Sequence, residues 1–104
     1  MITVIASVEL KPNAQAPFLE HFLELIPLVH REKGCLEYYP AIDIDSEITS
    51  QAKNEKTVTI LEKWDSLEAL RDHLAAPHMN EYREKIQDLV ISVSLKILQP
   101  VTKS

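Results

Sequence analysis

The order in which apolar periodicity changes along the chain constrains its fold more than any other feature of the sequence. Segments that alternate apolar and polar residues, as strands do, are separated by segments with the 3.6-residue spacing of amphipathic helices. The strand-like segments are 2–10, 35–44, 57–64 and 90–98, and the helical segments are 14–33 and 66–89. The resulting order, β-α-β-β-α-β, predicts an α+β protein with the split β-α-β, ferredoxin-like fold.

The first helical segment has clear signals at its ends and one conflict inside. Its apolar face is formed by Phe18, Phe22, Leu25 and Val29. Asn13 is suited to cap the start of this helix, and Gly34 is suited to the C′ position after its end. Pro27 lacks a backbone donor and clashes with the preceding turn, so we expect it to kink or split the helix.

The second helical segment divides into two helices. Asp65 followed by Glu68 is a variant of the capping box and predicts a helix that opens at Ser66. Pro77 suits the first position of a further helix. The side chains expected to face the core are Leu67, Leu70 and Leu74 in the first of these helices, and Met79, Tyr82, Ile86 and Leu89 in the second.

The second strand and the stretch after it carry signals of an edge position. Pro40 within the segment 35–44 favours an edge strand or a bulge, because proline cannot donate to the ladder. Residues 45–56 are polar and form a long connection for a hairpin. Connections of this length are typically functional, grip a partner, or are disordered.

Composition excludes several functional classes. The 104 residues suit one domain, 1–104, and the formal net charge of −5 argues against nucleic-acid binding. No apolar run approaches the ~20 residues of a membrane span, and the start lacks the positive region of a secretory signal. The single cysteine, Cys35, and the single glycine, Gly34, exclude an internal disulfide, a four-thiolate metal site and glycine-rich phosphate loops. We therefore expect a cytoplasmic protein without a nucleotide cofactor bound in that way.

The sheet predicts self-association. Helices in this fold cover one face of a four-stranded sheet, yet the first strand carries Ile5 on its other face and the second strand offers apolar or aromatic side chains on both. Two half-covered sheets that face each other would bury these side chains. We therefore expect a homodimer with a sheet-on-sheet interface.

Glu62 is the first candidate for chemistry. On its strand it has the same parity as Val58, Ile60 and Trp64, which favour the core. A carboxyl group in apolar surroundings has a raised pKa, which is how a general base near neutral pH is made. The alternative is an acid at the end of a strand that reaches solvent or a nearby Lys or Arg.

Two histidines follow Glu62 in sequence. A helix packed back on the sheet would bring His73 over Glu62, and a carboxylate–imidazole pair fixes the histidine tautomer and holds a proton ready for transfer. The alternative for His73 is a position half in water at the helix edge. His78 lies near a helix N-terminus, and its alternative is a simple surface position. The five-residue spacing, interrupted by Pro77, does not match the His-x-x-x-His of zinc helices, so we expect no metal.

Aromatic side chains could line a pocket for an aromatic ligand. Tyr38, Trp64 and Tyr82 are the candidates for substrate binding, together with His78. The alternative for each aromatic residue is ordinary core packing.

At this point the chain resembles a known family. The stretches 32-EKGCLEY-38, 61-LEKW-64 and 66-SLEALRDHLAAPHM-79, together with 1-MITVIASVELKPN-13, are similar to the antibiotic biosynthesis monooxygenase (ABM) domain. The resemblance spans nearly the whole chain. It implies a dimeric α+β barrel of ferredoxin-like protomers, with a pocket between helices and sheet in each protomer.

The resemblance also implies an activity. Several ABM proteins oxygenate quinols or polycyclic phenols without metal, flavin or haem, so the expected partners are a small aromatic substrate and molecular oxygen. Glu62, Trp64 and His73 match the family's recurrent Glu, Trp and His, His78 matches a frequent second His, and Tyr38 a commonly aromatic strand position. Haem-degrading relatives instead use an Asn, a Trp and a His where this chain has Ala6-Ser7, His73 and Arg83, which disfavours haem degradation.

The sequence leaves three functions open. The first is a cofactor-independent monooxygenase acting on a quinol or another hydroxylated aromatic compound. The second is a proton-transfer isomerase or decarboxylase of a small carbonyl compound, which would need Arg71 or Arg83 at the pocket if its substrate were phosphorylated. The third is a non-catalytic dimeric module that binds a small ligand and would tolerate loss of both Glu62 and His73.

Overall fold

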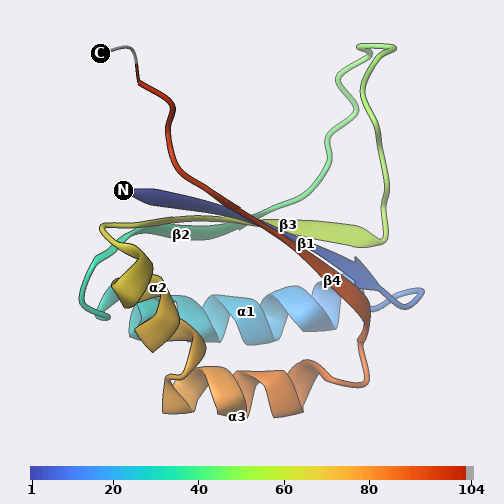
Figure 1. Ribbon diagram of the computed structural model, residues 1–104. Helices are drawn as coiled ribbons and strands as arrows, with labels where there is room; N and C mark the ends of the chain where they lie inside the picture. The colour runs from blue at the N-terminus through green and yellow to red at the C-terminus, as the bar shows by residue number, and fades with distance from the viewer. Residues whose placement is uncertain (103–104) are drawn as a thin grey trace.

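The computed structural model describes residues 1–102. Its elements follow the order β-α-β-β-α-α-β, which confirms the predicted α+β, ferredoxin-like fold and the division of the second helical segment at Pro77. The elements are β1 (Ile2–Leu10), α1 (Gln15–His30), β2 (Cys35–Ala41), β3 (Thr57–Trp64), α2 (Leu67–Leu74), α3 (Pro77–Ile86) and β4 (Val90–Leu98). All three helices lie on one side of the sheet (Figure 1).

The sheet is antiparallel, with the strand order β2-β3-β1-β4. Strands β1 and β3 pair continuously from Ile2 opposite Trp64 to Glu9 opposite Thr57. Paired residues share a face of the sheet, so Tyr38 on β2, Glu62 on β3 and Val4 on β1 form one row across it. The sheet thus fixes Glu62 beside Tyr38 on the side that carries the helices.

The core lies between this face of the sheet and the helices. Strand β1 alternates as predicted, with Val4, Ala6, Val8 and Leu10 buried. The predicted apolar face of α1 is also confirmed, because Phe18, Phe22, Leu25 and Val29 are all at most 4% exposed. From α3, the buried side chains are Met79, Tyr82 and Ile86.

The predicted ends of α1 were wrong. Ala14 occupies the capping position without a side-chain hydrogen bond, and Asn13 instead takes a left-handed turn conformation with φ of 64°. Gly34 does have a positive φ, 86°, but it lies in the turn that enters β2, after the helix has ended at His30. Pro27 does not split the helix. The carbonyl that it leaves without a partner belongs to Leu23, whose side chain is 58% exposed, so water can satisfy it.

Helix α2 differs from its prediction in the face that it buries. Ser66 is the capping residue, and its Oγ accepts a hydrogen bond from the Ala69 N–H at 3.1 Å, so the cap does not involve Asp65. Of the predicted leucine stripe only Leu70 is buried. Leu67 and Leu74 are 42% and 39% exposed, whereas Ala69 and His73 point inward. The spacing of the leucines had assigned this core position to Leu74, but His73 occupies it.

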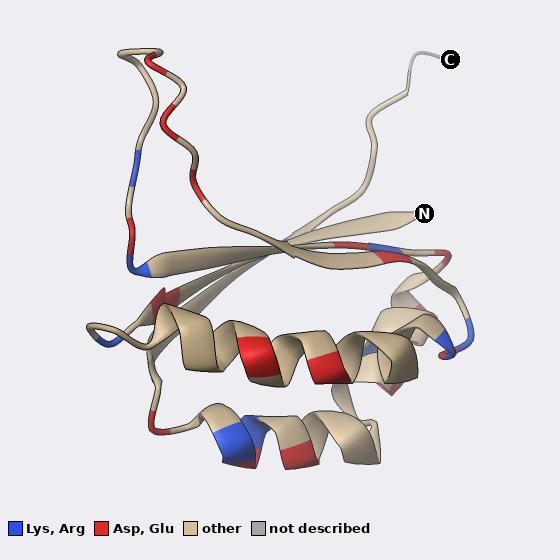
Figure 2. Cartoon of the chain, turned by 180° about the vertical axis from the view of Figure 1, so that it is seen from behind, with Lys and Arg blue, Asp and Glu red and all other residues tan. Residues whose placement is uncertain are grey.

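Strand β2 ends three residues earlier than predicted. The chain leaves the sheet after Ala41, and residues 42–56 form a long arm that rises on the side of the sheet away from the helices (Figure 1). The arm is closed at its base by the Asp43 carboxylate, which accepts a hydrogen bond from the Asn54 N–H at 2.7 Å. This bond ties Asp43 to the other limb of the arm, which explains why 42–44 do not continue the strand. Acidic residues line one limb (Figure 2).

The face of the sheet opposite the helices is uncovered in the protomer. A row of apolar side chains crosses it, with Tyr39, Leu61 and Ile5 adjacent on β2, β3 and β1. Tyr39 is 45% exposed. Among the helices that the structure describes, none is long and apolar enough to cross a membrane.

Candidate active site

Glu62 points into the protein from the middle row of the sheet. Its side chain is nearly buried, at 8% exposure, and its Oε1 accepts a hydrogen bond from the Trp64 indole N–H at 3.0 Å. Glu62 and Trp64 are two residues apart on β3, so strand alternation places both side chains on the helix-facing side. No Lys or Arg forms an ion pair with Glu62 within residues 1–102, so the alternative of a solvated or Lys/Arg-paired acid was wrong.

Burial sets the ionisation of Glu62. Desolvation raises the pKa of this carboxyl group from 4.5 to about 7, partly opposed by the hydrogen bond from Trp64 and reinforced by the negative charge of Glu32. A group with this pKa exchanges a proton readily at neutral pH.

His73 lies directly over Glu62, as predicted. It is 1% exposed, and its Nε2 is 3.9 Å from Glu62 Oε1, so the alternative of a half-solvated helix-edge histidine was wrong. The ring is held between two aromatic side chains, with centroid distances of 4.5 Å to Trp64 and 5.3 Å to Tyr38. Burial lowers the pKa of His73, although the hydrogen bond to Glu32 opposes this effect. Burial therefore favours the neutral form of the imidazole.

A second acidic group, missed in the sequence, completes this cluster. Glu32 lies in the turn between α1 and β2, and its carboxylate is 2.9 Å from His73 Nδ1 and 2.7 Å from His78 Nε2. No periodicity marks a turn residue, and 41 residues separate Glu32 from His73. The one signal in the sequence was its place at the start of 32-EKGCLEY-38, and no role was assigned to it there.

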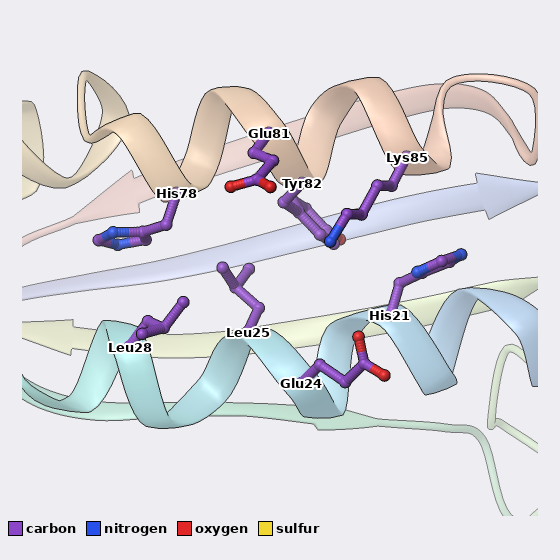
Figure 3. A pocket seen from close by; sticks show the side chains of 8 residues that line it. All are labelled: His21, Glu24, Leu25, Leu28, His78, Glu81, Tyr82 and Lys85. Atoms are coloured by element: carbon purple, nitrogen blue, oxygen red, sulfur yellow. The ribbon is translucent and has the colours of Figure 1, made fainter.

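His78 is not a simple surface residue. It follows Pro77 at the start of α3, and its side chain is 23% exposed and bonded to Glu32. Figure 3 shows it at one end of the groove between α1 and α3, which Leu25 and Leu28 line from α1 and Tyr82 from α3. This groove encloses only about 60 Å³, too little for an organic substrate. His78 therefore contacts the buried cluster through Glu32 rather than lining the substrate cavity.

A larger cavity lies on the other side of Glu62 and His73. It encloses about 290 Å³, at the small end of the range for ligand pockets. Its polar residues are Tyr38, Glu62, His73, Tyr82 and Arg83, and its apolar residues are Ala6, Val8, Ile60, Leu74, Met79, Ile86, Val93 and Leu95. Trp64 and His78 do not line it. The cavity is bordered by β4, where Val93 and Leu95 are 54% and 51% exposed because no helix covers this edge.

The two tyrosines of the cavity remain hydroxyl donors. Burial, with a contribution from the charge of Glu62, raises the pKa of Tyr38 and Tyr82 well above the usual range. Cys35 is a poor nucleophile, because burial raises the pKa of its thiol to about 11. No group of three His, Cys, Asp or Glu side chains among residues 1–102 has an arrangement that could hold a metal ion.

The fold and the site together define a class: a ferredoxin-like protein with a buried carboxylate–histidine pair at the wall of an apolar cavity. The sequence family described as antibiotic biosynthesis monooxygenase matches residues 1–85. The chain belongs to this family, which confirms the resemblance seen in the sequence.

Individual relatives agree with this assignment. The Escherichia coli K12 protein named "Probable quinol monooxygenase YgiN" is 32% identical over 102 residues, which cover 96% of this chain and 98% of the relative. The crystal structure of PA3566 from Pseudomonas aeruginosa has the same fold, with a TM-score of 0.81 at 20% identity over 97% of this chain and 94% of that one. Rv0793 from Mycobacterium tuberculosis gives a TM-score of 0.79 at 23% identity, covering 99% and 97%. The family and the E. coli relative support a monooxygenase-type function.

Proposed function

We propose that the protein is a cofactor-independent monooxygenase that acts on a quinol or another hydroxylated aromatic compound. The observation that carries this proposal is the placement of Glu62, with a pKa of about 7, beside His73 at the wall of a largely aliphatic cavity. The 32% identity to a protein named as a probable quinol monooxygenase supports the substrate class.

The chemistry begins with proton removal. Glu62 takes the proton of a phenolic hydroxyl, and the neutral His73, whose Nε2 is 3.9 Å from Glu62 Oε1, can accept that proton in turn. The phenolate is rich enough in electrons to transfer one to molecular oxygen. Tyr38 and Tyr82 line the cavity, and their hydroxyl groups can donate hydrogen bonds to the negative charge that develops.

The remaining steps use the same proton. The superoxide and the phenoxyl radical combine at a ring carbon that carries hydrogen, and the pair Glu62–His73 returns the proton to the peroxide formed. Loss of water then breaks the O–O bond and removes the ring hydrogen, which leaves a carbonyl group. One O₂ and one phenol give one quinone and one water, so the enzyme supplies no electrons.

The test is oxygen consumption with a panel of hydroquinones and anthrols in the presence of a metal chelator. Wild-type protein should consume oxygen faster than heat-denatured protein, which corrects for autoxidation, and labelled O₂ should place one labelled atom in the product. Glu62→Gln, His73→Ala and the double variant should each lose roughly 10²–10⁴ in rate, because residues that act as one unit are not additive. Exposed Glu68→Gln on α2 is the matched control. Wild-type turnover in both single variants would contradict the assignment of the site.

The same experiment separates the other two functions. A proton-transfer isomerase of a phosphorylated substrate needs a free cation, but Arg83 is the cavity's single Lys or Arg, and its guanidinium donates to the Leu74 carbonyl and the Asn80 side chain. A non-catalytic binding module gains nothing from a buried carboxylate whose ionisation is opposed by burial. Ligand binding without oxygen uptake that survives loss of Glu62 and His73 would favour the module.

A further inference from the structure

The turn that carries Glu32 is held rigidly. The Glu32 backbone N–H donates to the Val29 carbonyl at 2.9 Å, and its carbonyl accepts from the Cys35 N–H at 3.2 Å. The Gly34 carbonyl accepts from the Asp65 N–H at 2.9 Å, which ties the turn to the end of β3. The Glu32 side chain is 13% exposed. The backbone position from which the Glu32 side chain extends is therefore fixed, and its carboxylate has little access to water.

The hydrogen bonds of Glu32 determine where the protons lie. An ionised carboxylate accepts hydrogen bonds and donates none. At 2.9 Å and 3.2 Å from the two Glu32 oxygens, the His73 Nδ1 must therefore carry a hydrogen, and at 2.7 Å the His78 Nε2 must carry one as well. In a neutral imidazole only one nitrogen is protonated. The Nε2 of His73 is then an unprotonated acceptor, and it is the nitrogen that faces Glu62.

We propose that Glu32 is a positioning residue that fixes His73 as the Nδ1–H tautomer, so that Nε2 can accept the proton taken by Glu62. The catalytic consequence rests on the proposed function, whereas the tautomer of His73 does not. When His73 is protonated during the reaction, the Glu32 carboxylate also stabilises the imidazolium through a charge-assisted hydrogen bond. Glu32 does not line the cavity, so its proposed role requires no contact with the substrate.

His78 supports this arrangement from the other side. Its hydrogen bond to Oε2 holds the carboxylate in the rotamer that reaches His73. His78 is the more exposed of the two histidines and lies at one end of the groove, whereas Glu24 lies towards the other end, beside His21 (Figure 3). Removing His78 leaves the Glu32–His73 contact available, so it is expected to have a smaller effect than removing Glu32.

The experiment measures the His73 tautomer directly, by two-bond ¹H–¹⁵N correlation of the ring nitrogens at pH 7.5. The wild type should show the Nδ1–H form. In Glu32→Ala the remaining carboxylate next to the ring is Glu62, which faces Nε2, so the population should shift to the Nε2–H form. Glu24→Ala, which removes an exposed glutamate from α1, is the matched control and should keep the wild-type spectrum. His78→Ala should also keep the Nδ1–H form.

Kinetics supply the second readout. With any substrate found, Glu32→Ala should lower kcat by about 10²- to 10⁴-fold with little change in KM, because a wrong tautomer removes the proton acceptor without altering the cavity. Glu32→Gln, which keeps size and an acceptor oxygen, should recover part of this loss. An Nε2–H form in the wild type, or an unchanged Nδ1–H form in Glu32→Ala, would overturn the proposal. The spectrum is independent of turnover, so absence of oxygen consumption would count against the proposed function and leave the tautomer assignment standing.

Discussion

Replacing Glu62 by glutamine should stabilise the protein at alkaline pH and have little effect at acidic pH. Glutamine keeps the size of the side chain and an oxygen that can accept the Trp64 N–H, so it changes mainly the charge. In the wild type the pKa of this carboxyl group is about 7 in the folded state and about 4.5 in the unfolded chain. The folded protein therefore binds the proton more tightly, and this contribution to stability is lost as the pH rises from about 4.5 to about 7.

The magnitude follows from the two pKa values. The rise from 4.5 to about 7 corresponds to about 3 kcal/mol of differential stability. About 2 kcal/mol of this difference should develop between pH 5 and pH 8, which is a large fraction of the stability of a domain of this size. His73 titrates in both proteins, and its pKa is lowered mainly by burial, so the difference between Glu62→Gln and wild type isolates the carboxyl group.

The assay is urea denaturation at several pH values from 5 to 8.5, followed by circular dichroism and by the fluorescence of Trp64, the single tryptophan. Protein concentration must be the same throughout, because association shifts the apparent stability. Glu20→Gln, at an exposed position of α1, is the matched control and should change stability by less than about 0.5 kcal/mol. A stability difference for Glu62→Gln that is flat across the range, or that decreases with pH, would refute the claim that Glu62 is buried with a raised pKa.

Three further outcomes are expected. Sedimentation at micromolar concentration should give a homodimer, because association would bury the apolar row of Ile5, Leu61 and Tyr39 on the open face of the sheet. A species of 11.9 kDa would contradict this. Gly34→Ala should lower the free energy of unfolding, measured by urea denaturation, by about 1–3 kcal/mol. The φ of Gly34 is +86°, and the added methyl group would lie 2.7 Å from the Ala69 Cβ. Unchanged stability would contradict this and show that the turn relaxes. Elemental analysis and a visible spectrum of purified protein should show no stoichiometric metal, flavin or haem. One bound equivalent of any of these would contradict the proposal that the enzyme is cofactor-independent.

Three of the four strands were predictable to the residue because they have a simple period and clear boundaries, whereas β2 ends at Ala41 rather than at residue 44. The segments 57–64 and 90–98 match β3 and β4 to the residue. For helix α2 the prediction of the buried face was wrong. The rotation of this eight-residue helix about its axis is set by the Ser66 cap, by Pro77 and by the close approach of Ala69 to Gly34. The spacing of its leucines therefore had little influence on which face is buried.

The candidate site was predictable only in part. The parity of a strand placed Glu62, and the return of the following helix placed His73, since both follow from local geometry. Glu32 was missed because its role depends on a contact across 41 residues, made by a turn that has no period. Trp64 was assigned to substrate binding, but it lies behind the cavity, where it donates to Glu62 and packs on His73.

The arm formed by residues 42–56 has a consequence for how such a protein can change over evolutionary time. It leaves the sheet after Ala41 and returns at Thr57, while Glu62 lies near the other end of β3. The register of β3 is fixed independently by its pairing with β1 over Ile2–Glu9. Insertions or deletions in the arm can therefore be absorbed without moving the carboxylate, the histidine or the cavity. New partners or new specificity can be acquired there while the chemistry stays as it is.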